Sequence, residues 1–478
     1  MSTTDATDPP STLASPDQSD DEAGSFEQDT GSLKWMTLKV SGAVPSARSG
    51  HTLTVLNNYA FCYGGSGENS TIDENGIETF GPSAEMFCCR LEAAGSRQPM
   101  RWERVTTGGE APLARWGHTA TVIDKTTFAV FGGFHSDTNR FNDLHIFDTQ
   151  KMTWMQPLEM MADFTPRGNH IPKKGISNAV PDPRGGHTTT LVGSTLVVFG
   201  GYGGTGYARR DFNDVALFEL ESQAWLKIPP IQGKAPEARS GHSASNHNDN
   251  SIFYFGGWNA GSQFNNLCEF GVQVVDLFFA LAIFYNKKYS SNNCLLFFFP
   301  DVLNVGNLKN DATDIKLAWS NPDVSMGLPR WGHSGCSVKA IPNWRMFVFG
   351  GATSNSAGGN QPVTSCSYDN QVSVLDMGTM GWTTPAIEGD LPLPRSDTPF
   401  AYDSKNSRLL MFGGWSGEWH GDMISMDIGN IVGPPYAIMG LEPERGPVTG
   451  GVPITIRGID FVKSDQITVR FLIPGRWM

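Results

Sequence analysis

Short segments in which apolar and polar residues alternate recur along the chain and predict many short β-strands. Thr119, Thr121 and Ile123 form one such alternation, and Phe128 and Val130 begin another. Successive side chains of a strand point to opposite faces, so a period of two indicates strands with at least one buried face. Turn-forming residues separate these segments, because 54 glycines and 30 prolines are spread through the sequence. We therefore expect an all-β protein.

The segments belong to a repeat that starts with Arg-x-Gly-His and continues to a pair of glycines. Five copies of the motif occur, at Arg48/His51, Arg115/His118, Arg184/His187, Arg239/His242 and Arg330/His333. A sixth copy begins at Arg395, and we interpret Asp397 as the replacement of its histidine. The first glycine of each pair follows at Gly64, Gly132, Gly200, Gly256, Gly350 and Gly413. This regularity indicates that the arginines and histidines are structural, and we expect them to tie successive repeats together through backbone carbonyls.

A tryptophan precedes the arginine of each copy and marks the fourth strand of the unit. These residues are Trp35, Trp102, Trp154, Trp225, Trp319 and Trp382. A single four-stranded sheet would leave its faces in water, whereas several sheets stacked radially bury them. The sixth repeat lacks a tryptophan strand of its own, and Trp35 has no repeat before it. We predict that the Trp35 strand completes the last sheet, which leaves no free sheet edge.

Taken together, the paired glycines, the Arg-x-Gly-His copies and the tryptophans resemble the kelch repeat over residues 33–430. The resemblance implies a six-bladed β-propeller whose last blade is closed by the N-terminal strand. It also implies a module that binds other molecules through loops that depart from the repeat.

One interval between repeats is too long, and its excess lies in residues 267–300. Removing this stretch would restore the usual spacing and bring residues 264–266 next to residues 301–305, which would then form the third strand of the fourth blade. A functional apolar insertion and a membrane span are alternatives, although Asp276 and Lys287 interrupt the run. We favour a translated intron, because Leu-Leu-Phe-Phe-Phe-Pro is what a pyrimidine-rich tract before a splice acceptor would encode.

The two ends of the chain differ in composition from the repeats. Residues 1–32 are acidic and poor in apolar side chains, so we expect a disordered tail. Residues 431–436 are interpreted as a linker. Residues 437–478 resemble the first half of an IPT/TIG immunoglobulin-like domain, on the strength of the Gly-Gly turn at Gly450 and the Ile-Thr-Ile segment from Ile454 to Ile456.

Candidate chemistry is sparse. The sequence contains no nucleophile motif, phosphate-binding loop or zinc-binding spacing, so we expect no catalytic residue, metal or cofactor. The net charge of −13 argues against nucleic acid as a partner. Seven cysteines without a CxxC pair suit a reducing compartment, so we expect a cytoplasmic or nuclear protein without a membrane segment.

The leading hypothesis is therefore a monomeric, non-enzymatic scaffold that binds a protein or peptide. Aromatic residues just beyond the paired glycines are its candidate anchors: Phe134, His135, Tyr202, Trp258, Trp415 and Trp419. The alternative is an enzyme with a site in the central channel, resembling galactose oxidase or a sugar-acid epimerase.

Overall fold

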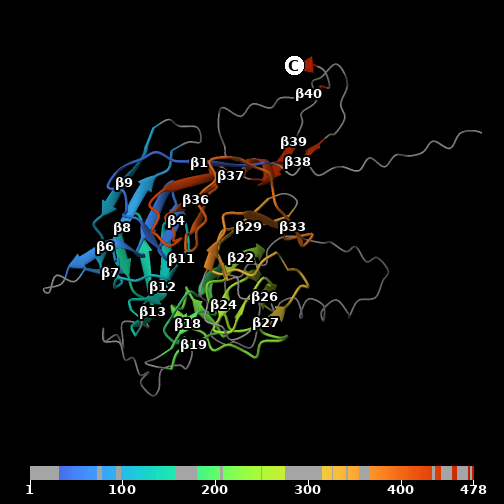
Figure 1. Ribbon diagram of the computed structural model, residues 1–478. Coiled ribbons are helices and arrows are strands. Elements are labelled where there is room, and N and C mark those ends of the chain that lie inside the picture. Colours follow the sequence, from blue (N-terminus) through green and yellow to red (C-terminus); the bar gives the residue numbers. More distant parts are fainter. Residues whose placement is uncertain are drawn as a thin grey trace, which may run out of the picture. The chain divides into compact units, whose positions relative to one another are not determined.

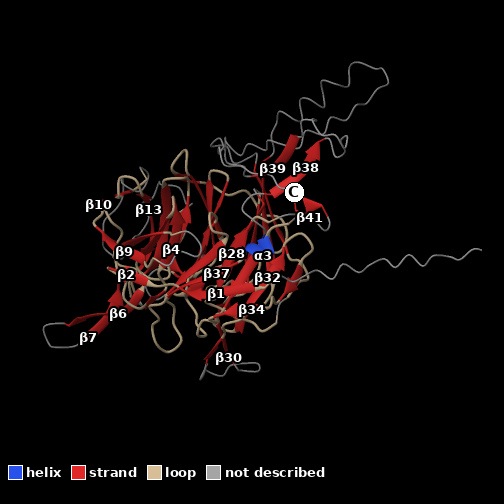
Figure 2. Cartoon of the chain, turned by 90° about the horizontal axis from the view of Figure 1, so that it is seen from above, coloured by secondary structure: helices blue, strands red, loops and turns tan. Residues whose placement is uncertain are grey.

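Each repeat forms a mainly antiparallel sheet, and almost every described element of the computed structural model is a strand (Figure 2). The structure describes residues 32–72, 78–92, 98–136, 138–157, 180–204, 208–248, 250–274, 315–325, 327–340, 343–354, 366–432, 437–442, 455–459, 472–473 and 476–477. The expected disordered tail lies outside these residues except for Ser32, and so does the linker except for Ile431 and Val432. Within the described chain, no helix is long and apolar enough to cross a bilayer.

Six sheets, numbered I to VI here in repeat order, carry the repeats, and each is given from its inner to its outer strand. Sheet I contains β4 (Thr52–Leu56), β5 (Tyr59–Tyr63), β8 (Met86–Arg90), β9 (Met100–Val105) and β2 (Val40–Gly42). Sheet II contains β11 (Thr119–Val122), β12 (Thr127–Phe134), β13 (Arg140–Asp148), β14 (Thr153–Met155) and β10 (Gly108–Gly109). Sheet III contains β16 (Thr188–Val192), β17 (Thr195–Phe199), β20 (Val215–Glu219) and β21 (Ala224–Trp225).

The second half of the circle is built in the same way. Sheet IV contains β22 (Ser243–Asn248), β23 (Ser251–Phe255), β26 (Leu267–Val274) and β27 (Ile315–Ser320). Sheet V contains β28 (Ser334–Val338), β29 (Arg345–Phe349), β32 (Val372–Asp376) and β33 (Gly381–Thr383). Sheet VI contains β35 (Phe400–Asp403), β36 (Arg408–Phe412), β37 (Met423–Asp427), β1 (Leu33–Thr37) and β34 (Ile387–Gly389).

Short strands extend some repeats, and others follow the sixth sheet. The extensions are β3 (Arg48–Ser49), β6 (Ser66–Ile72), β7 (Glu78–Pro82), β15 (Arg184–Gly185), β18 (Tyr202–Gly203), β19 (Arg210–Asp211), β24 (Trp258–Asn259), β25 (Ser262–Gln263), β30 (Ala352–Ser354) and β31 (Cys366–Tyr368). After sheet VI come α3 (Gly429–Val432), β38 (Ala437–Glu442), β39 (Thr455–Ile459), β40 (Leu472–Ile473) and β41 (Arg476–Trp477). β38 pairs with β39, and β40 pairs with β41.

The inner strands contact one another in cyclic order, so the sheets form a closed circle (Figure 1). β4 contacts β11, and the contacts continue through β16, β22, β28 and β35 back to β4. The core is divided in the same way. Each of six apolar clusters lies between two neighbouring sheets, from sheets I and II round to sheets VI and I.

The repeated tryptophan fills the gap between neighbouring sheets at the same place in every repeat. In sheet II, Trp154 packs on Tyr63 of sheet I, with 5.1 Å between ring centroids. The equivalent pairs are Trp225 on Phe131, Trp319 on Phe199, Trp382 on Phe255, Trp35 on Phe349 and Trp102 on Phe412, at 5.0 to 5.8 Å. Large aromatic side chains contribute much buried area, so these contacts hold each sheet to its predecessor.

The N-terminal strand completes sheet VI. β1 pairs antiparallel with β37, so that Trp35 lies opposite Met426, and parallel with β34 on its other side. Trp35 is 1% exposed. The strand that the sixth repeat lacks in sequence is therefore supplied by the start of the first.

Sheet IV differs from the expected arrangement. Its third strand is β26 (Leu267–Val274), which consists of the first eight residues of the stretch that we interpreted as an insertion. Leu267, Cys268 and Phe270 are all buried, because the strand pairs with β23 on one side and β27 on the other. The interval count placed the excess too early, since Asn266 already occupies the position that Asp143 and Asp214 hold in sheets II and III. Residues 275–314, which include the alternative strand at 301–305, lie outside the described residues.

A chain that starts at residue 41 should unfold at a much lower temperature and in a single transition. It would lose β1, leave β37 paired on one side only and remove the buried Trp35, and deletion of a buried tryptophan side chain alone costs about 3–5 kcal/mol. Circular dichroism melting checks this, with a chain that starts at residue 31 as the control. An unchanged melting temperature in the shorter chain would contradict the closure.

Two internal deletions distinguish the observed third strand from the expected one. Val274 and Ile315 are paired across β26 and β27, so the chain leaves and returns at adjacent positions. Replacing residues 275–314 with Asn-Gly should therefore give a hairpin and leave the melting temperature within a few degrees of the parent. Deleting residues 267–300 instead removes β26 and should abolish cooperative melting. The reverse outcome would support the strand at residues 301–305.

Candidate functional site

The six arginines of the repeat are buried and bind within their own sheet. Arg115 donates from Nη1 to the Gly132 carbonyl at 2.9 Å and to Asp143 Oδ1 at 2.7 Å. Although burial alone would raise it, the charge of Arg115 holds the pKa of Asp143 well below its usual range. The Nη1-to-glycine bond recurs at Arg48, Arg184, Arg239, Arg330 and Arg395. The expectation that these guanidinium groups tie successive repeats together is thus wrong. The arginine carbonyl does so instead, as in the bond from Gly65 N to Arg115 O at 2.9 Å.

Four of the five repeat histidines link neighbouring sheets through hydroxyl groups. Nε2 of His187 lies 3.2 Å from Thr119 Oγ1 of the preceding sheet. The equivalent pairs are His118 with Thr52, His242 with Thr188 and His333 with Ser243. Burial, and then the charge of the repeat's arginine, lowers the pKa of His51, His187 and His333 to about 3, and lowers those of His118 and His242 as well. These side chains are neutral and structural.

The paired glycines are required because neighbouring sheets approach too closely for a side chain. At Gly132, with φ of +64°, an added Cβ would lie 2.8 Å from His187 Cε1 and 2.8 Å from the Arg184 carbonyl oxygen. At Gly133 it would lie 2.9 Å from His118 Cβ. Real Cβ atoms do not make contacts this short, so another residue at Gly132 would force neighbouring sheets apart, and one at Gly133 would clash within its own repeat.

A continuous ring of backbone hydrogen bonds joins all six repeats at the start of their inner strands. Each member donates from N to the carbonyl of the member before it, at 2.7 to 3.0 Å, and the last bond closes the ring. The members are Gly50, Gly117, Gly186, Gly241, Gly332 and Asp397, and we call them the glycine ring. All have φ between +53° and +63°.

This ring corrects the alignment of the sixth repeat. Asp397 stands at the glycine position of Arg-x-Gly-His, and Thr398 stands at the histidine position. An added Cβ at Gly414 would lie 3.0 Å from Thr398 Cβ, just as one at Gly133 meets His118 Cβ. Aspartate is among the few residues that adopt positive φ without a large steric cost. The unusual residue is therefore a carboxylate at the ring and not a replaced histidine.

The six candidate anchors lie where the second strands emerge on the side of the glycine ring, but they are not equivalent. Trp258 is 39% exposed and packs at a tilt on Trp331, with 5.8 Å between ring centroids. Trp415 and Trp419 form a half-buried pair at 4.9 Å. Phe134 is only 8% exposed because it fills the space over Gly185, so its assignment as a binding anchor is wrong.

The other two candidates are held by neighbouring groups. Tyr202 is half-buried, with the Arg140 guanidinium 5.9 Å from the centre of its ring. His135 is exposed, and its Nδ1 lies 3.0 Å from the Ala114 carbonyl oxygen. Neither residue adds much exposed apolar area to this side of the molecule.

Sequence reasoning missed several exposed apolar residues on the same side. Trp116, which packs on Phe134 at 4.6 Å, is 39% exposed. Leucines two residues before the repeat arginine are still more exposed: Leu113 at 51%, Leu328 at 67% and Leu393 at 59%. A Leu-x-Arg pattern in three of the six repeats was the available signal. We call these residues, the glycine ring, Trp258, Trp331, Trp415 and Trp419 the glycine-ring face.

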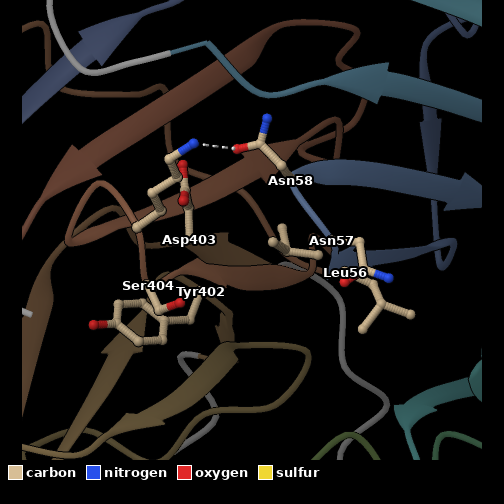
Figure 3. A pocket seen from close by; sticks show the side chains of 8 residues that line it. Leu56, Asn57, Asn58, Tyr402, Asp403 and Ser404 are labelled. Atoms are coloured by element: carbon tan, nitrogen blue, oxygen red, sulfur yellow. Dashed lines mark hydrogen bonds between the residues drawn. The ribbon is translucent and has the colours of Figure 1, made fainter. Parts of the chain in front are cut away.

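A pocket opens at the opposite end of the inner strands, where the first and last sheets meet (Figure 3). Its volume is about 240 Å³, and the turns after β4 and β35 line it. Lys405 Nζ lies 3.5 Å from Asn58 Oδ1 in its wall. The lining combines small polar groups with Leu56 and Tyr402 and lacks a convergent set of titratable residues.

The described residues hold no group of three or more His, Cys, Asp or Glu side chains close enough to bind a metal ion. The adjacent cysteines also have a structural explanation. Cys88 faces the core between sheets I and II, whereas Cys89 faces the core between sheets VI and I. Burial raises the pKa of Cys89 to about 12, so this thiol stays protonated.

The circle of four- and five-stranded sheets with paired glycines defines the class of kelch-type β-propellers. A solved structure entitled "Structure of YjhT" has the same fold, with a TM-score of 0.50 and 15% identity, over 87% of this chain and 98% of the other. The family described as the KLHDC2/KLHL20/DRC7 Kelch-repeats domain matches residues 16–173 and 164–276, which together exceed half of the chain. The chain belongs to this family.

Three relatives are similar to different shares of this chain. The flagellar outer arm dynein alpha chain of Chlamydomonas reinhardtii is 28% identical over 444 residues, which are 92% of this chain and 8% of that one. Kelch domain-containing protein 3 of Bos taurus is 30% identical over 50% of this chain and 57% of its own length. Host cell factor 2 of Homo sapiens is 28% identical over 66% of this chain and 32% of its own. The chain therefore spans at most 57% of the length of any of these three relatives.

Acid should destabilise the folded protein through its buried histidines. A folded-state pKa of about 3, against about 6.5 in the unfolded chain, means that the unfolded chain binds more protons between these values. The stability that depends on the neutral histidine is therefore fully present above pH 6.5 and is lost as the pH falls towards 3. His187→Gln should reduce that loss by about 1.4 kcal/mol per pH unit below 6.5. Urea unfolding at pH 7 and pH 5 measures the difference, with the exposed His135→Gln as control. An identical pH dependence in His187→Gln and the parent would contradict the assignment.

Proposed function

We propose that this chain is a six-bladed, non-enzymatic propeller that binds a protein partner through the glycine-ring face. The exposed apolar side chains on this face carry the proposal. Tryptophans and leucines that fold into no core lie at equivalent places in several repeats, and exposed tryptophan is typical of binding anchors. Other kelch proteins among the relatives support a protein-interaction propeller.

The six sheets, each of which contacts the sheet on either side, support six blades. We further propose a monomer in the cytoplasm or nucleus. The C-terminal region is proposed to begin an immunoglobulin-like domain of the IPT/TIG type. The antiparallel pairing of β38 with β39, in which Leu441 lies opposite Ile456, supports its first two strands.

The source of the partner can be narrowed by one relative. The aligned region of the outer arm dynein alpha chain covers 92% of this chain, a larger share than residues 33–430 alone would supply. We propose on this similarity that the partner belongs to a flagellar assembly. An enzyme with a site at the centre of the propeller remains the alternative.

The proposal is tested by capture from extracted flagellar axonemes with the full chain as bait. Trp116→Ala combined with Trp258→Ala should weaken capture of a stoichiometric partner by about tenfold or more and leave a folded chain with a cooperative melting curve, because both side chains are 39% exposed and belong to no core cluster. Met155→Ala is the matched control, since Met155 is 41% exposed on an outer strand.

Equal capture by the parent and the double tryptophan variant would contradict the binding face. Bound copper, or turnover of a galactose-type substrate by the purified chain, would favour the enzymatic alternative. Both assays use the same preparation, and the melting curve of that preparation shows whether the protein is folded.

A further inference from the structure

The glycine ring carries a single side chain, and that side chain is a carboxylate. Asp397 has a φ of +53°, in the left-handed region that the other five members occupy as glycine. A residue with a Cβ is less favourable there than glycine, so the position is occupied at some conformational cost. The carboxylate is therefore a departure from the repeat at the point where all six repeats meet.

Within the described chain, no cationic group compensates this carboxylate. Ser396 Oγ donates to Asp397 Oδ2 at 2.9 Å, and a Cβ built at Gly332 would lie 3.0 Å from Oδ1. The arginine of the same repeat, Arg395, is directed away, because its guanidinium binds Asp422 at 2.6 and 2.9 Å. The other repeat arginines are also buried within their own sheets.

The carboxylate is accessible to solvent but is surrounded by protein. Asp397 is exposed, although its neighbours crowd it enough that burial raises the pKa of its carboxyl, with the Ser396 hydrogen bond opposing that rise. A partly desolvated carboxylate interacts with an opposite charge more strongly than one in open water.

Three tryptophans approach two other members of the ring. Trp116 Cβ lies 3.4 Å from a Cβ built at Gly50, which is the next member after Asp397. Trp331 Cβ lies 3.4 Å from the same point at Gly241, where Trp258 also approaches to 3.7 Å. The faces of indole groups attract cations, most strongly when both groups are partly desolvated.

We propose that the glycine-ring face accepts a lysine or arginine side chain of the partner, with Asp397 as its counter-ion and the neighbouring tryptophans as its apolar wall. Only a long side chain with a terminal charge matches both features, because its methylene groups pack on indole while its cation reaches the carboxylate. This inference rests on the proposed function and specifies the chemistry of the partner.

Three labelled nine-residue peptides test the inference on the full chain. They consist of glycine and serine around a central lysine, arginine or norleucine, and fluorescence anisotropy is measured at low and high NaCl. The lysine and arginine peptides should bind about tenfold more tightly than the norleucine peptide at low salt. High salt should remove most of this preference.

Two substitutions remove the charge without removing the fold. Asp397→Asn keeps the size of the side chain, and Asp397→Gly restores the residue found at the other five ring positions, so its melting temperature should be equal or higher. Both should abolish the preference for lysine and arginine. Asp211→Asn is the control, because Asp211 already accepts hydrogen bonds from Ser240 Oγ and Ala260 N at 3.3 Å.

The results separate this inference from the proposed function. Absence of peptide binding, equal binding of the three peptides, or a preference that survives Asp397→Asn would overturn the cation site. A preference lost equally in Asp211→Asn would also overturn it. Axonemal capture that depends on Trp258 but not on Asp397 would leave the binding face in place without its cation site.

Discussion

The close approach of neighbouring sheets at the paired glycines is the constraint on which the rest of the structure depends. At the first glycine of most pairs, the space of a side chain is already filled by the histidine of the next repeat and by its arginine carbonyl. That proximity allows the glycine ring to close through six short backbone hydrogen bonds. It also forces the repeat histidines to be neutral, since they lie in a dry contact beside an arginine.

The outer parts of neighbouring sheets are held together by a different contact. Sheets that meet closely at the centre diverge towards the outside, and the repeated tryptophan fills the widening gap by packing on the aromatic residue before the glycines of the preceding sheet. The last sheet needs the same tryptophan. Its source is β1, from the other end of the repeat region, so the two ends of the circle are joined by backbone pairing as well as by packing.

Because the repeat accounts for the buried polar residues, the surface that departs from it carries the functional argument. The repeated arginines and most of the repeated histidines have partners inside the scaffold. By contrast, Trp116, Trp258 and the leucines before the arginines expose apolar area to solvent. Asp397 is the matching departure among polar residues, since it brings a charge to a position where the other repeats carry no side chain.

The sequence by itself determined the strands, the repeat boundaries and the closure by Trp35, because these depend on local alternation and on residues that recur at fixed intervals. It did not determine the third strand of sheet IV, because a largely apolar segment such as Leu267–Val274 fits a buried strand as well as an insertion. The alignment of the sixth repeat was available from the sequence, since the histidine of the other five copies is the third residue after the arginine and that residue is Thr398 in the sixth. The pairing of β26 settled the third strand, because a register between strands exists only when distant parts of the chain meet. The tertiary structure also decided which of these residues are exposed. Phe134 and Trp258 each follow a pair of glycines, but only Phe134 is buried, because it packs over Gly185 of the next repeat.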